Sequence, residues 1–178
     1  MKRLYILLVA LCLSLPVWAK SPALSQLLSE LNAQYQRQDL LPIDIRDKDD
    51  VTKLAYFVQH INEENTPEKL KLEAYLTGLH NGIYDNANML QQVKMPNWFC
   101  MRDTMIMNPK RHPEFLKNII WDGLEKIANE DPNRFSRVDY INAFGMPISS
   151  VIYYGLQTQY PCYDSVPQNQ RIRGWKYD

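Results

Sequence analysis

The stretch TPEKLKLEAYLTGLHNGIYDNANML, residues 66–90, decides the fold class. It opens with Thr66-Pro67-Glu68, which combines a capping hydroxyl, a proline at the first turn and an early acidic residue. These three features are typical of a helix start. Apolar side chains then recur three and four residues apart on one face: Leu72, Tyr75, Leu76, Leu79 and Ile83. The segment therefore predicts one long helix that ends near Leu90.

Two glycines, Gly78 and Gly82, lie four residues apart inside this predicted helix. Each glycine costs about 1 kcal/mol of helix propensity relative to alanine, so the pair indicates that another backbone approaches closely. In a membrane the same spacing is typical of helix dimerisation. For this chain we favour tight packing against another segment of the same molecule.

Helical periodicity continues on both sides of residues 66–90. It predicts helices over residues 22–37, 51–61, 113–129, 136–144 and 147–160. Ser21, Asp50 and Ser136 stand at the N-cap positions of three of them. The stretch between residues 91 and 112 has no clear period, and no convincing run of alternating strand residues occurs. We therefore predict an all-α fold, a compact bundle of five to six helices.

The predicted organisation has four parts. Residues 1–19 resemble a secretory signal peptide, with Lys2 and Arg3 ahead of an apolar run and a cleavage site after Ala19. An N-terminal helical extension over residues 20–65 packs on a helical core domain over 66–162, and residues 163–178 form a polar tail. The apolar run is too short to span a membrane comfortably, so after cleavage no integral membrane segment is expected. The alternative is an uncleaved N-terminal anchor.

The charge balance restricts the class of partner. The 178 residues contain 20 Lys and Arg against 20 Asp and Glu. Loss of Lys2 and Arg3 with the signal leaves a net charge of −2. A nearly neutral chain lacks the electrostatic basis for binding nucleic acid or anionic lipid.

Export also changes the interpretation of the cysteines. Cys12 leaves with the signal peptide, so that the mature chain retains Cys100 and Cys162. An even count in an oxidising compartment predicts a single disulfide. It would close a loop of about sixty residues and stabilise the fold by about 4 kcal/mol before strain. The alternative is two independent buried thiols.

Motifs of catalysis are largely missing from the sequence. His60, His80 and His112 lack the spacing of a zinc motif. Cys100 could act as a thiol nucleophile only if it were not paired with Cys162. Phosphate-binding glycine motifs do not occur either. We predict that the chain is not an enzyme and that it binds no metal and no cofactor.

Methionines gather in one short segment. Five of them fall within nineteen residues, beside Trp98 and Phe99: Met89, Met95, Met101, Met105 and Met107. The favoured interpretation is that this irregular segment covers the core, where the flexible methionine side chain fills gaps. The alternative is a partner-binding surface, because methionine and aromatic residues are enriched at the centre of protein interfaces. The two interpretations are compatible.

Four short motifs resemble the Tai/Rap group of periplasmic immunity proteins. They are Tyr75-Leu76-Thr77-Gly78-x3-Gly82, Trp98-Phe99-Cys100, His112-Pro113-Glu114-Phe115-Leu116 and Tyr160-Pro161-Cys162, and the resemblance covers about residues 70–162. Proteins of this group are small, helical, disulfide-bonded and often homodimeric. They neutralise peptidoglycan amidases delivered by type VI secretion. The resemblance implies a periplasmic protein whose partner is a cognate amidase effector.

Under that resemblance, the mechanism is occlusion of the amidase cleft by a loop. The candidate partner-binding residues surround the predicted disulfide in the methionine-rich segment: Asn97, Trp98, Arg102, Asp103, Asn108, Lys110 and Arg111. Trp98 has an alternative role as a core anchor. The rival functions are an accessory or binding protein of the cell envelope and a cell-wall hydrolase.

Overall fold

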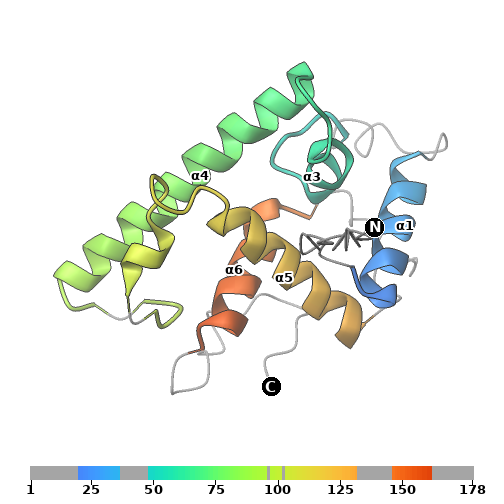
Figure 1. Ribbon diagram of the computed structural model, residues 1–178. Coiled ribbons are helices and arrows are strands. Elements are labelled where there is room, and N and C mark those ends of the chain that lie inside the picture. The colour runs from blue at the N-terminus through green and yellow to red at the C-terminus, as the bar shows by residue number, and fades with distance from the viewer. Residues whose placement is uncertain (1–19, 37–47, 96, 102, 132–145, 162–178) are drawn as a thin grey trace, which may run out of the picture.

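The computed structural model describes residues 20–36, 48–95, 97–101, 103–131 and 146–161. The helices follow in the order α1 (Pro22–Tyr35), α3 (Leu54–His60), α4 (Pro67–Gln92), η1 (Thr104–Met107), α5 (Phe115–Glu130) and α6 (Ile148–Gln159) (Figure 1). Within these ranges the only β-type pairing is an isolated bridge between Lys53 and Pro147. The predicted all-α fold is confirmed. The signal peptide, the helix predicted over 136–144 and the polar tail lie outside the described residues.

Two predicted helix starts are confirmed in detail. The hydroxyl of Ser21 accepts a hydrogen bond from the backbone N–H of Leu24 (3.0 Å), and the hydroxyl of Thr66 accepts one from the N–H of Lys69 (3.2 Å). A proline follows each cap, where its missing N–H removes no intrahelical bond. Local sequence therefore determines where α1 and α4 begin.

The predicted start at Asp50 is wrong. The Asp50 carboxylate accepts from the N–H of Thr52 (2.9 Å) in a turn, and α3 begins only at Leu54 without a side-chain cap. The reason is tertiary, because the Leu54 N–H donates to the carbonyl of Met146 (2.8 Å). The Ile148 N–H donates in turn to the carbonyl of Thr52 (2.8 Å). These bonds join the start of α3 to the start of α6 and take the place of a helical first turn.

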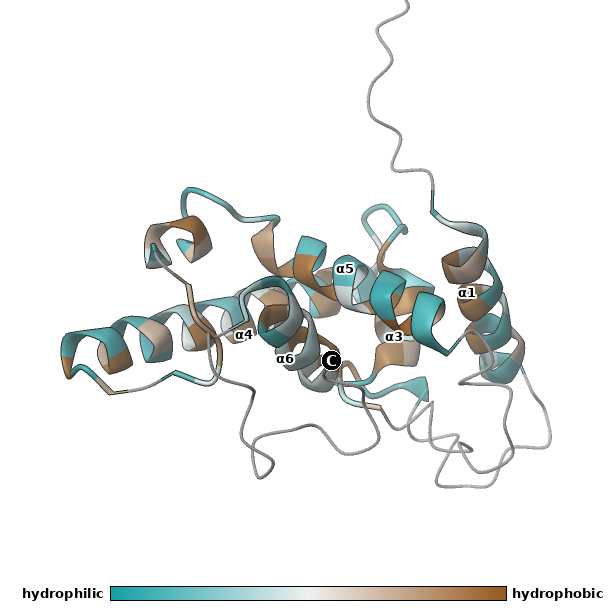
Figure 2. Cartoon of the chain, turned by 90° about the horizontal axis from the view of Figure 1, so that it is seen from below, coloured by the Kyte–Doolittle hydropathy of each residue, from teal (hydrophilic) through white to brown (hydrophobic). Residues whose placement is uncertain are grey.

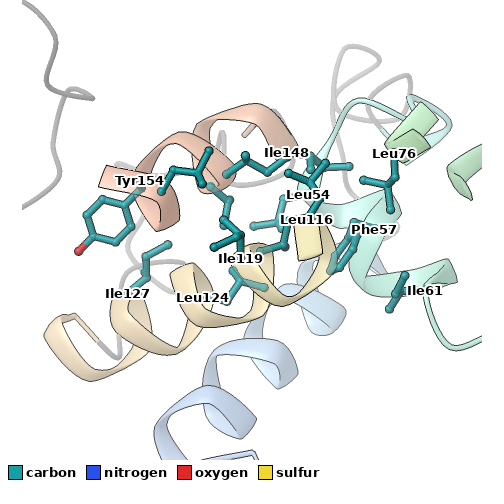
Figure 3. Close-up of a cluster of buried hydrophobic side chains, with 14 of the residues drawn as sticks. Leu54, Phe57, Ile61, Leu76, Leu116, Ile119, Leu124, Ile127, Ile148 and Tyr154 are labelled. Atoms are coloured by element: carbon teal, nitrogen blue, oxygen red, sulfur yellow. The ribbon is translucent and has the colours of Figure 1, made fainter. Parts of the chain in front are cut away.

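The core lies where α5 and α6 pack together, with α1 and α3 on its flanks. Figure 3 shows side chains from four helices converging on it: Leu54, Phe57 and Ile61 from α3, Leu76 from α4, Leu116, Ile119, Leu124 and Ile127 from α5, and Ile148 and Tyr154 from α6. The apolar residues of α1 join the same cluster. Each fully buried aliphatic side chain stabilises the fold by about 1.5–3 kcal/mol relative to its exposed state.

Close backbone contact occurs between α5 and α6, where two glycines meet. A Cβ atom on Gly155 would lie 2.5 Å from the carbonyl oxygen of Ile119, and one on Gly123 would lie 3.0 Å from that of Val151. By contrast, a Cβ on Gly78 or Gly82 would meet no described atom within 4 Å. The close intramolecular packing predicted at Gly78 and Gly82 is therefore not seen within the described residues, where both glycines are exposed and no atom comes within contact distance.

A charged network joins α4 to α5. Glu73 accepts hydrogen bonds from Lys69 (2.8 Å) and from Lys117 (3.0 Å), and Lys117 also pairs with Glu114 (3.2 Å). Burial alone would raise the pKa of Glu73, but the two lysine hydrogen bonds outweigh it and lower that pKa. The same carboxylates raise the pKa of Lys117 against the effect of its burial. The network fixes the first half of α4 against the core.

The second half of α4 extends away from the other helices. Seen from below in Figure 2, its C-terminal end extends beyond α5 and α6 and carries hydrophobic residues at its tip. Within the described residues, η1 is the short helix that packs against this half. The fold thus presents an apolar helix end and an irregular segment together at one extremity of the molecule.

Candidate functional site

The extremity of α4 carries an exposed apolar surface. Five residues from the end of α4, the turn that follows it and η1, with exposed fractions between 38% and 59%, form what we call the methionine-rich patch: Met89, Val93, Met95, Met105 and Ile106. Methionine side chains adapt their shape to a partner and make favourable contacts with aromatic rings. An exposed cluster of apolar side chains is typical of a protein-binding surface.

Polar contacts hold η1 against α4 beneath the patch. The Tyr84 hydroxyl donates to the sulfur of Met105 (3.8 Å) and accepts from the Asn108 amide (3.1 Å). The Thr104 hydroxyl donates to the Gln91 side-chain oxygen (3.2 Å). These contacts give an irregular segment a defined place on the helix, which lowers the entropy that a partner must remove on binding.

A buried histidine holds the C-terminal end of η1 in place. His80 is only 3% exposed, and its Nε2 donates to the carbonyl oxygen of Met107 (2.8 Å). Its ring stacks on Phe115, with centroids 5.9 Å apart. Burial lowers the pKa of His80, although the bond to Met107 opposes the shift. His80 is therefore a neutral structural donor near pH 7, and the sequence alone could not identify Met107 as its partner.

Three of the sequence-predicted binding residues stabilise turns. The Asn97 side-chain oxygen accepts from the N–H of Trp98 (2.9 Å). Asp103 caps η1 by accepting from the N–H of Met105 (2.8 Å). The Asn108 side-chain oxygen accepts from the N–H groups of two residues in the turn that follows it, Lys110 (3.0 Å) and Arg111 (3.3 Å). Short polar side chains of this kind satisfy the backbone of irregular segments.

The remaining predicted residues differ in their surroundings. Lys110 and Arg111 are exposed and lie in the turn that follows η1. Trp98 is half-buried and packs edge-on against Phe99 (centroids 4.5 Å apart) and Tyr153 (4.4 Å). Arg102 lies outside the described residues. The structure thus places Trp98 on a second surface, next to α6.

That second surface is an open groove along α4, which we call the α4 groove. It has a volume of about 750 Å³, and its lining residues are Ala74, Tyr75, Gly78, Leu79, Gly82, Ile83, Asn86, Trp98 and Tyr153. Small residues of α4 lie along it, and Trp98 and Tyr153 line it from two other segments. The sequence singled out both glycines and Trp98, but it gave no indication that Tyr153 lies next to them.

Cys100 lies close in space to the end of α6. Its N–H donates to the carbonyl oxygen of Tyr160 (2.8 Å), although sixty residues separate the two along the chain. Cys162 itself lies outside the described residues. The contact explains how the irregular segment after α4 is fixed to the core.

The described residues contain no group of three or more His, Cys, Asp and Glu side chains that could hold a metal ion. In the same part of the chain, no helix has the length and apolar content needed to cross a bilayer. Comparisons with protein-family models, with curated proteins and with solved structures gave no match. The candidate binding surfaces on the described residues are the methionine-rich patch and the α4 groove.

Proposed function

We propose that the chain is a periplasmic immunity protein that binds a peptidoglycan-degrading amidase effector of a type VI secretion system and occludes its active site. The resemblance of residues 70–162 to the Tai/Rap group suggests the class of partner. The methionine-rich patch carries the proposal, because five of the seven large hydrophobic side chains that are exposed on the described residues belong to it. Export through a signal peptide cleaved after Ala19 belongs to the same proposal.

The patch suits an inhibitor that acts by shape. Its side chains come from a long helix and from a segment that Tyr84 and His80 hold in place, so binding requires little further ordering. Apolar anchors at the centre and charged residues at the rim are the usual anatomy of an interface. The exposed Lys110 and Arg111 follow η1 and would supply part of such a rim. Occlusion requires no chemistry from the inhibitor.

We further propose a disulfide between Cys100 and Cys162. The bond between the Cys100 N–H and the Tyr160 carbonyl supports it, because Cys162 follows Tyr160 by two residues. Closing this loop would stabilise the fold by about 4 kcal/mol in the chain-entropy account. Intact-mass measurement after thiol alkylation, with and without prior reduction, tests the pairing. Two alkylated cysteines in the unreduced mature protein would contradict it.

The decisive experiment uses the mature oxidised chain as bait in a periplasmic extract, followed by a peptidoglycan-hydrolysis assay on the protein captured. We expect one stoichiometric amidase whose activity falls on mixing. Capture of no hydrolase would exclude the immunity function and favour an envelope accessory role. Activity of the purified chain on cell-wall fragments would instead support a hydrolase.

Matched variants locate the interface. Ile106→Asp places a charge in the methionine-rich patch, whereas Leu70→Asp places one on a side chain that is 63% exposed in the first turn of α4. A buried interface anchor is worth about 2 kcal/mol or more, so Ile106→Asp should weaken binding by at least about 30-fold. Leu70→Asp should bind as the wild type does. Equal affinities for the two variants would move the interface away from the patch.

A further inference from the structure

The α4 groove offers a ligand a different kind of surface from the methionine-rich patch. Its aliphatic residues are covered, because Ile83 is buried and Leu79 is half-buried. Among its lining residues, Tyr153 is the large hydrophobic residue that is exposed. The exposed aliphatic anchors that suit a protein interface lie in the patch instead. The groove presents mainly aromatic rings, small residues and one amide.

The hydrogen-bonding groups of the groove are neutral and available. They are the hydroxyls of Tyr75 and Tyr153, the indole N–H of Trp98 and the side-chain amide of Asn86. Within the described residues, none of these groups has a hydrogen-bond partner. Burial, together with Asp50 and Tyr153, raises the pKa of Tyr75, so its hydroxyl keeps its proton. The described lining includes no charged side chain, so it matches a ligand rich in neutral donors and acceptors.

Two aromatic rings form a fixed corner in the groove. Trp98 and Tyr153 meet edge to face, with ring centroids 4.4 Å apart and planes at 85°. Trp98 also packs against the buried Phe99, and its N–H donates to the side-chain oxygen of Asn97. The N–H of Cys100 is bonded to the end of α6, which carries Tyr153. The corner therefore needs little further ordering when a ligand binds.

The groove follows one stripe along α4. Ala74 and Asn86 stand at its two ends on that helix, twelve residues and therefore about 18 Å apart along the axis. Its volume of about 750 Å³ lies within the range of roughly 300–1,000 Å³ that is usual for small-molecule sites. An open groove of this length fits an extended chain of several linked rings.

Gly82 and Asn86 restrict the ligand further. No described atom lies within 4 Å of the position that a Cβ would take on Gly82, so a methyl group can rest on the helix backbone there. Asn86 follows Gly82 by four residues and therefore lies beside it on the same helix face. The amide of Asn86 can both donate to and accept from another amide. A methyl group joined to an amide is an acetamido group.

We infer that the α4 groove binds a neutral glycan strand built of N-acetylated hexosamines. The C–H faces of the sugar rings lie on Trp98 and Tyr153, because the negative face of an aromatic ring attracts weakly positive C–H groups. Sugar hydroxyls pair with Tyr75, and an acetamido group pairs with Asn86 above Gly82. The inference is independent of the proposed immunity function, since it concerns a surface other than the methionine-rich patch and requires no effector.

Calorimetric titration of the purified mature chain with chitotetraose, a linear tetramer of N-acetylglucosamine, tests the site. We expect saturable binding with a Kd below about 1 mM. In NMR spectra the indole N–H resonance of Trp98, identified as the one that Trp98→Phe removes, should shift as the sugar is added. Cellotetraose, the analogue without acetamido groups, should bind at least about 10-fold more weakly, because Asn86 then loses its amide partner.

Matched variants test whether the sugar occupies the groove. Gly82→Leu fills the space beside Asn86 and should weaken chitotetraose binding by at least about 10-fold. Leucine is a better helix former than glycine and the position is exposed, so we expect this variant to fold. Thr77→Leu is the control, because Thr77 is exposed on α4 but does not line the groove. Urea unfolding of each variant confirms that it folds.

Three results would overturn the inference. They are the absence of saturable binding at millimolar chitotetraose, wild-type affinity in Gly82→Leu, and equal affinity for chitotetraose and cellotetraose. Loss of amidase capture in Gly82→Leu, in a chain that binds no sugar, would assign the groove to a protein partner. Binding of chitotetraose by a chain that captures no amidase would support the glycan site and refute only the immunity function.

Discussion

Replacing glycine by alanine should have opposite effects on stability at Gly155, which is in close contact with α5, and at Gly78, which is not. Gly155→Ala adds a Cβ 2.5 Å from the carbonyl oxygen of Ile119 and 2.8 Å from its Cγ2, across the α5–α6 contact. Gly78→Ala adds the same group to the middle of α4, where no described atom lies within 4 Å. Both positions are helical, so the intrinsic helix propensity changes equally.

The magnitudes follow from these distances. Alanine improves helix propensity by about 1 kcal/mol at both positions. At Gly155 the obstacle is a backbone carbonyl, so α5 and α6 must move apart, and overpacking of this kind costs up to about 3 kcal/mol. We therefore expect Gly155→Ala to lower the free energy of unfolding by about 2 kcal/mol and Gly78→Ala to raise it by about 1 kcal/mol.

Urea denaturation followed by far-UV circular dichroism measures the change in the free energy of unfolding, and thermal unfolding measures the change in Tm. For a domain of this size, the expected shifts in Tm are about 4–8 °C downward for Gly155→Ala and about 2–4 °C upward for Gly78→Ala. Gly123→Ala should fall between them, because its Cβ would lie 3.0 Å from the Val151 carbonyl. Equal stabilisation by Gly155→Ala and Gly78→Ala would refute the reasoning.

Three further substitutions test polar contacts by urea unfolding. Tyr154→Phe removes the hydrogen bond to the Glu130 carboxylate (2.7 Å) and should lower the free energy of unfolding by about 1.5 kcal/mol; an unchanged midpoint would contradict this. Wild-type stability should fall as the pH drops below about 6.5, because unfolded His80 binds a proton that the buried, lowered-pKa imidazole resists. His80→Gln should remove that part of the pH profile, and an identical slope in both proteins would exclude His80 as its source. Lys117→Met should cost about 0.5 kcal/mol at pH 7, and less at acidic pH once Glu73, with its lowered pKa, is protonated; a loss unaffected by pH would assign it to packing instead.

The segments with clear periodicity and local caps were the predictable part of the fold. Ser21 and Thr66 cap helices where expected, and α5 and α6 cover nearly the predicted ranges. These features depend on residues within one helical turn, so a single sequence contains the necessary information. Asp50 failed as a cap because hydrogen bonds to Met146 and Ile148, almost a hundred residues away, shape that turn.

The candidate site was predictable only in outline. The methionine content of residues 89–107 indicated an unusual segment, and the structure separates its members by burial. Met107 is fully buried, whereas Met89 and Met95 are more than half exposed. Which methionines are buried depends on the contact between His80 and Met107 and on how far α4 extends beyond the core. Neither feature produces a periodic pattern in the sequence.

The sequence by itself determined the helical class, the main helix boundaries and the presence of glycines that require an explanation. Only the tertiary structure decided which glycines serve packing: Gly123 and Gly155 lie between α5 and α6, while Gly78 and Gly82 are exposed along the α4 groove. The physical reason is that helix propensity depends on neighbours along the chain, whereas a close approach depends on the atoms that another segment brings within about 4 Å. A glycine looks the same in sequence whether that space is filled or open.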